Sequence, residues 1–177
     1  MIIKDLTTIN NYYKTILSDP AWKYKNVRTG GSMSSGAAQK YECMSTDDIC
    51  KMPVKRIAHK DSILFLWVTT PFMHDGLHVM ESWGFKYKTA IYWRKIMSLG
   101  MGYYFRGQVE LCLVGIRGKI KAFRCQKPNF LQTKVRKHSQ KPDEIFEWIE
   151  PVSQDPKLEM FATTQRDGWD SFGKELK

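Results

Sequence analysis

The sequence lacks the features that mark several large classes of protein. Its 4 cysteines form no CxxC pair, which argues against a disulfide framework or a zinc knuckle and favours reduced thiols. His74 and His78 have the spacing of two ligands on one helix face, but no acidic or cysteine partner is near them in sequence. We interpret them as helix-surface residues and expect no metal. The chain contains neither a signal-peptide pattern nor an apolar run of the roughly 18 residues that a membrane span needs, so we expect a cytoplasmic protein without membrane association.

Negative charge is also scarce relative to positive charge. The chain has 28 Lys and Arg residues against 18 Asp and Glu residues, and its formal net charge is +10. Such an excess favours polyanionic partners, because basic side chains neutralise phosphates and release their counterions. A basic surface that serves only solubility is the alternative. At 177 residues, the chain is long enough to bury one substantial core, and we expect a single domain over residues 1–177.

Apolar runs that predict strands alternate with patterns that predict helices. Several of the runs are apolar on both faces, as in strands that are covered by helices on either side. Thr70 and Ser139 precede the two longer helical patterns and are candidate N-terminal caps. The predicted strands are 12–18, 62–69, 88–93, 109–116 and 157–162, and the predicted helices are 70–84, 139–152 and a short one after Ser45 or Thr46. This alternation predicts an α/β fold with a mainly parallel central sheet, whose ligands bind beyond the carboxyl ends of the strands.

Two stretches carry few apolar anchors and are predicted to be mobile loops. Residues 25–40 are rich in Gly, Ser and Ala, and residues 124–141 contain many Lys and Arg side chains. Both are long for a compact domain, and loops of such length are usually either functional or disordered.

The first long predicted strand ends at an unusual tetrapeptide, Asp19-Pro20-Ala21-Trp22. Pro20 lacks an N–H group and has a fixed φ, so it turns the chain and leaves carbonyl groups directed outward. An ionised Asp19 only accepts hydrogen bonds, and a carboxylate beside a carbonyl matches an amine with two N–H donors. Trp22 offers a flat ring for stacking on a base. These groups suit an exocyclic amine on a planar base such as adenine, although a buried structural Trp22 explains the tetrapeptide equally well.

A family resemblance extends this interpretation to nearly the whole chain. The segments that carry it are SDPAWKY, YECMS, LFLWVTT, SWGFKYKTAIYWRK, GMGYYFRGQVELCLVGIRG, KHSQKPDEIFEWIE and KLEMFATTQRDGWDSFG, in this order. The chain resembles the DPPW-type adenine-N6 methyltransferases, the family of the eukaryotic messenger-RNA adenosine methyltransferase and of many bacterial and phage proteins. Ala21 stands where that family has a second proline.

The resemblance implies a Rossmann-like methyltransferase fold that binds S-adenosylmethionine. It also accounts for the absence of a G-x-G-x-x-G motif after the first strand, because the family's cofactor segments lie partly after the catalytic motif. Asp19 and the Pro20 carbonyl would hold the adenine amine, and Trp22 would line or stack on the base. Ala21 belongs to the same catalytic motif, where the carbonyl needed from that region does not require a proline side chain. Hydrogen bonds from both N–H groups would stabilise the developing positive charge, so Asp19 acts as an orienting group rather than as a base.

Further site residues are implied by matching positions of the family pattern. Tyr41 and Glu110 would line the base pocket, and Lys141 would lie near the cofactor. The other cofactor positions depart from the pattern at Thr163 and Lys174, where the family commonly has Arg and Asn. The complete set of cofactor positions is Asp5, Leu6, Asp19, Lys141, Phe161, Thr163, Lys174 and Glu175.

The acceptor is expected to be nucleic acid, and DNA rather than RNA, because the chain has no accessory RNA-binding module. The basic side chains expected to contact the phosphate backbone are Lys134, Arg136, Lys137 and His138. A non-catalytic nucleic-acid-binding subunit, an RNA methyltransferase and a methyltransferase for a small molecule or a protein remain as alternatives. Composition leaves open whether the chain acts alone, as a homodimer or in a heterodimer.

Overall fold

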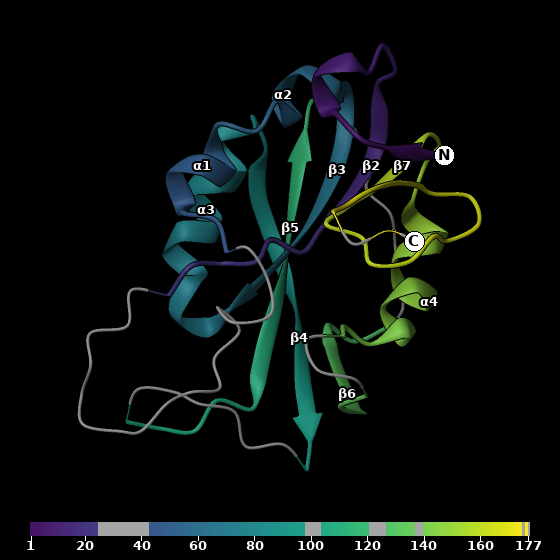
Figure 1. The fold of residues 1–177 in the computed structure, drawn as a ribbon. Helices are drawn as coiled ribbons and strands as arrows, with labels where there is room; N and C mark the ends of the chain where they lie inside the picture. The colour runs from purple at the N-terminus through teal and green to yellow at the C-terminus, as the bar shows by residue number, and fades with distance from the viewer. Residues whose placement is uncertain (25–42, 98–103, 121–126, 137–139, 175, 177) are drawn as a thin grey trace.

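The fold is described from a computed structural model for residues 1–24, 43–97, 104–120, 127–136, 140–174 and 176 (Figure 1). It contains one 8-stranded sheet with the order β1-β8-β7-β2-β3-β5-β4-β6. The strands are β1 (Ile2–Ile3), β2 (Tyr13–Ser18), β3 (Ala58–Thr69), β4 (Lys86–Ile96), β5 (Val109–Arg117), β6 (Phe130–Lys134), β7 (Lys157–Met160) and β8 (Asp170–Phe172). Every pairing is parallel except the two made by β5, so the predicted mainly parallel α/β, Rossmann-like fold is confirmed.

Helices cover both faces of the sheet, with α1 and α3 on one side and α4 on the other (Figure 1). The helical elements are η1 (Leu6–Thr8), α1 (Thr46–Cys50), α2 (Val54–Ile57), η3 (Thr70–Phe72), α3 (Met73–Ser82), η4 (Asp143–Ile145), α4 (Phe146–Ile149) and η5 (Glu150–Val152). Alternate residues of β3 enter two separate cores: Leu64 and Leu66 pack on the α3 side, whereas Phe65 and Trp67 pack on the α4 side. This two-sided burial explains why the central strands appear in the sequence as continuous apolar runs.

Helix α3 lies unusually close to the sheet at Gly76. A Cβ atom there would lie 2.5 Å from Cγ1 of Val68 on β3, so a larger residue would force the helix away. The predicted helix over 70–84 is present, but it begins as the 3-10 turn η3, and Thr70 is not its cap. The Thr70 hydroxyl instead donates to the carbonyl of Val109 at 3.2 Å, which ties η3 to the start of β5.

Two other predicted boundaries need correction. The helix expected over 139–152 is a series of short turns from Asp143 to Val152, because Pro151 cannot donate the backbone hydrogen bond that would extend α4. The loop expected over 124–141 contains β6, which pairs with β4 and buries Leu131. Most of the other predicted loop, 25–40, lies outside the described residues, as does the predicted cap Ser139.

Candidate active site

The tetrapeptide Asp19-Pro20-Ala21-Trp22 follows β2 at the carboxyl edge of the sheet, and its backbone is held on both sides. The N–H of Asp19 donates to the carbonyl of Met160 at 3.4 Å, and the N–H of Met44 donates to the carbonyl of Ala21 at 2.9 Å. The N–H of Trp22 donates to the carbonyl of Pro20 at 3.0 Å, which closes a tight turn. A carbonyl oxygen has two lone pairs, so Pro20 retains acceptor capacity for a ligand.

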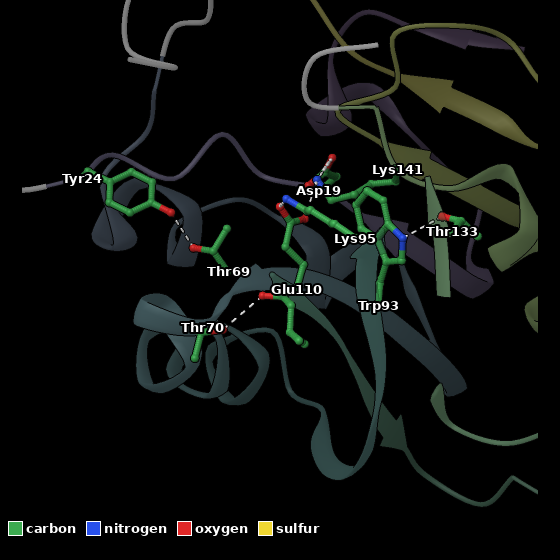
Figure 2. A network of polar contacts seen from close by, with 10 residues as sticks. Asp19, Tyr24, Thr69, Thr70, Trp93, Lys95, Glu110, Thr133 and Lys141 are labelled. Carbon is green, nitrogen blue, oxygen red and sulfur yellow. Dashed lines mark hydrogen bonds and ion pairs between the residues drawn. The ribbon is translucent and has the colours of Figure 1, made fainter. Parts of the chain in front are cut away.

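Four charged side chains of alternating sign form a chain beside this turn (Figure 2). Nζ of Lys141 donates to Oδ2 of Asp19 at 2.8 Å and lies 3.5 Å from Oε2 of Glu110. Lys95, near the end of β4, forms an ion pair with the other oxygen of Glu110. The Glu110 side chain is only 12% exposed, whereas that of Asp19 is 34% exposed. Asp19 is therefore the carboxylate of this network that an incoming ligand reaches most readily.

Burial and the neighbouring charges act in opposite directions on these groups. Burial raises the pKa of Asp19, and the Lys141 ammonium opposes this rise without abolishing it. Burial would also raise the pKa of Glu110, but Lys141 and Lys95 together hold that pKa below its usual range. Burial would lower the pKa of Lys141, but the carboxylates of Asp19 and Glu110 raise it overall. Glu110 and Lys141 are thus charged at neutral pH, and Lys141 favours the ionised form of Asp19.

Trp22 lies in the core and does not form an open stacking platform. Its side chain is 6% exposed, and its indole N–H donates to the carbonyl of Trp67 at 3.1 Å. The indole ring stacks on Phe72 with 5.4 Å between ring centroids, and Tyr24 meets the same Phe72 ring edge-on at 4.7 Å. The Tyr24 hydroxyl is 2.6 Å from Oγ1 of Thr69. These contacts support the structural interpretation of Trp22, while base stacking by its ring stays a prediction.

Replacing Trp22 by phenylalanine distinguishes the two roles. We expect Trp22→Phe to lower the free energy of unfolding by about 2 kcal/mol, because the smaller ring leaves a cavity and the bond to Trp67 is lost. Urea unfolding measures this effect, and steady-state kinetics on an adenine-containing oligonucleotide measures KM. Unchanged stability together with a raised KM would instead assign Trp22 to the substrate.

Glu159 on β7 is a polar group that the sequence analysis did not select. Burial raises its pKa to about 7, while Arg166 opposes the rise and Asp19 adds to it. Arg166 lies 3.5 Å from the Phe146 ring centroid and 3.2 Å from a carboxylate oxygen of Asp143. Nε of Arg166 and Oε2 of Glu144 are buried and have no hydrogen-bond partner among the described residues. Glu159 is thus linked both to Asp19 and to Arg166, and an unsatisfied polar atom such as Nε of Arg166 is a candidate contact for a polar ligand.

The pKa of Glu159 makes stability depend on pH. An unfolded glutamate titrates near pH 4.3, so the folded state loses stability as pH rises from there through about 7. We expect Glu159→Gln to raise the free energy of unfolding by about 1–3 kcal/mol at pH 8 and to leave it unchanged at pH 4. The matched control is Glu147→Gln, because Glu147 is exposed on α4. Equal effects of Glu159→Gln at both pH values would contradict the assignment.

The structure brings Asp19, Glu110 and Lys141 together. The other predicted cofactor residues that it describes have the following surroundings. Asp5 follows β1, where its carboxylate accepts a hydrogen bond from the N–H of Thr7, and Leu6 is buried. Phe161 contacts Phe172, and Thr163 and Lys174 are exposed. The roles of these five predicted residues stay predictions. Four other predicted residues lie outside the described part of the chain: Tyr41, Lys137, His138 and Glu175.

The two described candidates for phosphate contacts differ. Lys134 is exposed at the end of β6. Arg136 instead binds Asp143 at 2.6 Å and Glu144 at 2.9 Å, so its guanidinium is already neutralised within the protein. Phosphate binding by Arg136 would require these bonds to break.

No metal or membrane site emerges from the residues that can be described. Among them, no three His, Cys, Asp or Glu side chains are grouped to hold a metal ion, and His74 and His78 are exposed on α3. No helix in this part of the chain has the length and apolar character to cross a membrane.

A mostly parallel α/β sheet with a polar network at its carboxyl edge is the arrangement in which α/β proteins commonly bind their ligands (Figure 2). Comparison with known proteins identifies which class of protein the chain belongs to. The chain belongs to the MT-A70 family, which it matches over residues 13–175, and it is a methyltransferase of that family.

Relatives of the chain come from bacteria, plants and animals. The type II methyltransferase M.MunI of Mycoplasma sp is 32% identical in an alignment that covers 93% of this chain and 78% of that protein. The putative N(6)-adenosine-methyltransferase MT-A70-like of Medicago truncatula is 29% identical, with coverages of 93% and 26%. The N(6)-adenosine-methyltransferase catalytic subunit METTL3 of Homo sapiens is 27% identical, with coverages of 93% and 28%. The chain thus spans most of the Mycoplasma protein but about a quarter of these two plant and animal proteins.

Proposed function

We propose that the protein transfers the methyl group of S-adenosylmethionine to the N6 amine of adenine in DNA. The observation that carries the proposal is the accessible carboxylate of Asp19, which is fixed beside the Pro20 carbonyl at the carboxyl edge of the sheet. Membership of the MT-A70 family supports methyl transfer to adenine. The +10 charge supports a nucleic-acid acceptor. The 32% identity with the type II methyltransferase M.MunI, a DNA methyltransferase, supports DNA as the acceptor.

Asp19 and Pro20 would act on the adenine amine by orientation and charge stabilisation. The amine lone pair is delocalised into the ring, which makes the nitrogen a weak nucleophile. Its two N–H groups would donate hydrogen bonds to the Asp19 carboxylate and the Pro20 carbonyl. These bonds favour a pyramidal nitrogen and stabilise the positive charge that develops there. Lys141 supports this role because its ammonium favours the charged form of Asp19.

The residues beside Asp19 fit the methionine end of the cofactor. S-adenosylmethionine supplies an electrophilic methyl group on a positively charged sulfur. Its methionine end carries a carboxylate and an ammonium, which need cationic and anionic partners. Lys141 and the unpartnered Nε of Arg166 can bind a carboxylate, and Glu159 can accept from an ammonium, which would favour its ionised form.

The test is incubation of the protein with labelled S-adenosylmethionine and DNA or RNA oligonucleotides of the same base sequence. Digestion to nucleosides then identifies the labelled product. Label in N6-methyldeoxyadenosine supports the proposal, and label only in the RNA product moves the acceptor to RNA. Donor binding without transfer to either oligonucleotide would indicate a non-catalytic subunit, and label on another base would overturn the proposal.

A further inference from the structure

An exposed face of the sheet carries two aromatic rings beside two cations at the β4–β6 border. It consists of Tyr92 and Arg94 from β4 and of Phe130, Gln132 and Lys134 from β6, and we call it the β4–β6 face. The side chain of Tyr92 is 38% exposed and that of Phe130 is 47% exposed. Partly exposed rings on a sheet offer flat apolar surface to a partner.

Strand register places these side chains in two adjacent rows. Tyr92 pairs with Phe130, and Arg94 pairs with Gln132, so both pairs point to the same face. Nη1 of Arg94 also donates to Oε1 of Gln132 at 3.2 Å. Lys134 follows at the carboxyl end of β6. The rings therefore lie side by side, and the cations lie between them and the carboxyl edge of the sheet.

The charge of this region has one sign. The β4–β6 face carries the cations Arg94 and Lys134 and no carboxylate. Within the described residues, neither Arg94 nor Lys134 forms an ion pair with an acidic side chain. Both cations thus remain available to an anionic partner.

We propose that the β4–β6 face binds unpaired nucleotides that flank the target adenine, which makes single-stranded nucleic acid the preferred substrate. This inference rests on the proposed function. Adjacent rings bind the flat faces of bases, and cations bind the intervening phosphates. The bases must be unpaired because a duplex hides their faces in its own stack.

The β4–β6 face lies on the opposite side of β4 from the charged network of Asp19, Lys141, Glu110 and Lys95, and both reach the carboxyl end of that strand. Consecutive residues of a strand point to opposite faces, so Lys95 points toward Glu110 while Arg94 lies on the β4–β6 face. A single-stranded nucleic acid that passes from Asp19 around the carboxyl end of β4 would reach Arg94 and Lys134 before the two rings. A second copy of the chain is a less favourable occupant, because two faces of the same positive charge repel each other.

The experiment measures the binding of fluorescent oligonucleotides, single-stranded or duplex, by anisotropy at several salt concentrations. We expect Phe130→Ala and Tyr92→Ala each to weaken single-strand binding about fivefold to 100-fold and to change duplex binding little. Arg94→Gln and Lys134→Gln should each reduce the salt slope by about 0.7. The matched control is Tyr12→Ala, because Tyr12 is 59% exposed and precedes β2. Phe130→Leu replaces Phe130→Ala if the latter unfolds.

Single-strand affinity that is unchanged in the Tyr92 and Phe130 variants would overturn the inference. Loss of a dimer in sedimentation with unchanged nucleic-acid affinity would instead identify the face as a contact between copies. Binding does not require turnover, so the two proposals can fail separately. If the wild type transfers methyl groups and the variants bind single strands normally, only the inference is rejected. If the variants lose single-strand affinity but the wild type transfers no methyl group, only the proposed activity is rejected.

Discussion

Replacing Asp19 by alanine is expected to lower kcat/KM for methyl transfer by about 10²- to 10³-fold and to leave the protein folded. The carboxylate is the accessible end of the charged network, and its removal takes away the acceptor that orients the amine and stabilises its developing charge. Asp19→Asn should lower kcat/KM by nearly as much. The asparagine amide is neutral, and its NH₂ group is a donor that faces the N–H donors of the adenine amine. Single-turnover kinetics with labelled donor measures the chemical step separately from product release.

The matched control for Asp19 is Asp167→Asn. Asp167 is an exposed carboxylate between β7 and β8, so its substitution should leave kcat/KM unchanged. Circular dichroism and the affinity for S-adenosylmethionine show whether the Asp19 variants remain folded and able to bind the donor. Activity of Asp19→Ala within threefold of wild type would remove Asp19 from the reaction and with it the proposed role of the tetrapeptide.

The central strands could be predicted because most of their own buried residues are apolar. Leu64 to Val68 are buried on both faces of β3, and this produces a continuous apolar run that is typical of a central strand. Strand β6 could not be predicted in this way. Only Leu131 of its five residues is buried, and the strand exists because β4 offers it an edge to pair with.

In the candidate site too, the sequence indicated single residues but not the contacts between residues far apart in the chain. The family pattern selected Asp19, Glu110 and Lys141 as separate positions. It did not reveal that Lys141 binds a carboxylate 122 residues away, because that contact depends on the order of strands in the sheet. Local sequence suggested a stacking role for Trp22, whereas its burial depends on contacts with Trp67 and Phe72, which are also remote in the chain.

Of the two charged residues that the sequence analysis missed, Lys95 left a signal in the local sequence and Glu159 did not. Lys95 comes two residues after Trp93, so it lies on the same face as a buried ring of β4. Glu159 interrupts an apolar strand between two buried residues, Leu158 and Met160, and pairs in register with the buried Leu17. A charge that shares a face with buried neighbours needs a partner or a ligand. Strand periodicity applied to charged as well as apolar residues would have selected Lys95. Leu158 and Met160 point to the opposite face from Glu159, so its burial follows only from the pairing of β7 with β2.

Replacing Lys141 by methionine is expected to shift the pH dependence of methyl transfer and to reduce the rate. The ammonium lies 2.8 Å from Asp19 and 3.5 Å from Glu110, and its removal leaves two partly buried carboxylates with Lys95 as their neighbouring cation. Burial already raises the pKa of Asp19, and loss of Lys141 raises this pKa further. Activity requires ionised Asp19 and is lost as pH falls through its pKa. The acidic limb of kcat/KM should therefore move to higher pH in the variant, and kcat/KM at pH 7 should fall by about 10²-fold.

Two further variants separate this effect from general loss of a lysine. Lys141→Arg keeps the positive charge and should return the acidic limb toward its wild-type position. Lys157→Met removes a lysine that is likewise paired, with Glu150 at 2.9 Å, but lies outside the network, so it should leave the limb in place. Affinity for S-adenosylmethionine, measured by calorimetry, reports any separate contribution of Lys141 to the donor. A slower Lys141→Met enzyme whose acidic limb had not moved would show that Lys141 does not act through Asp19.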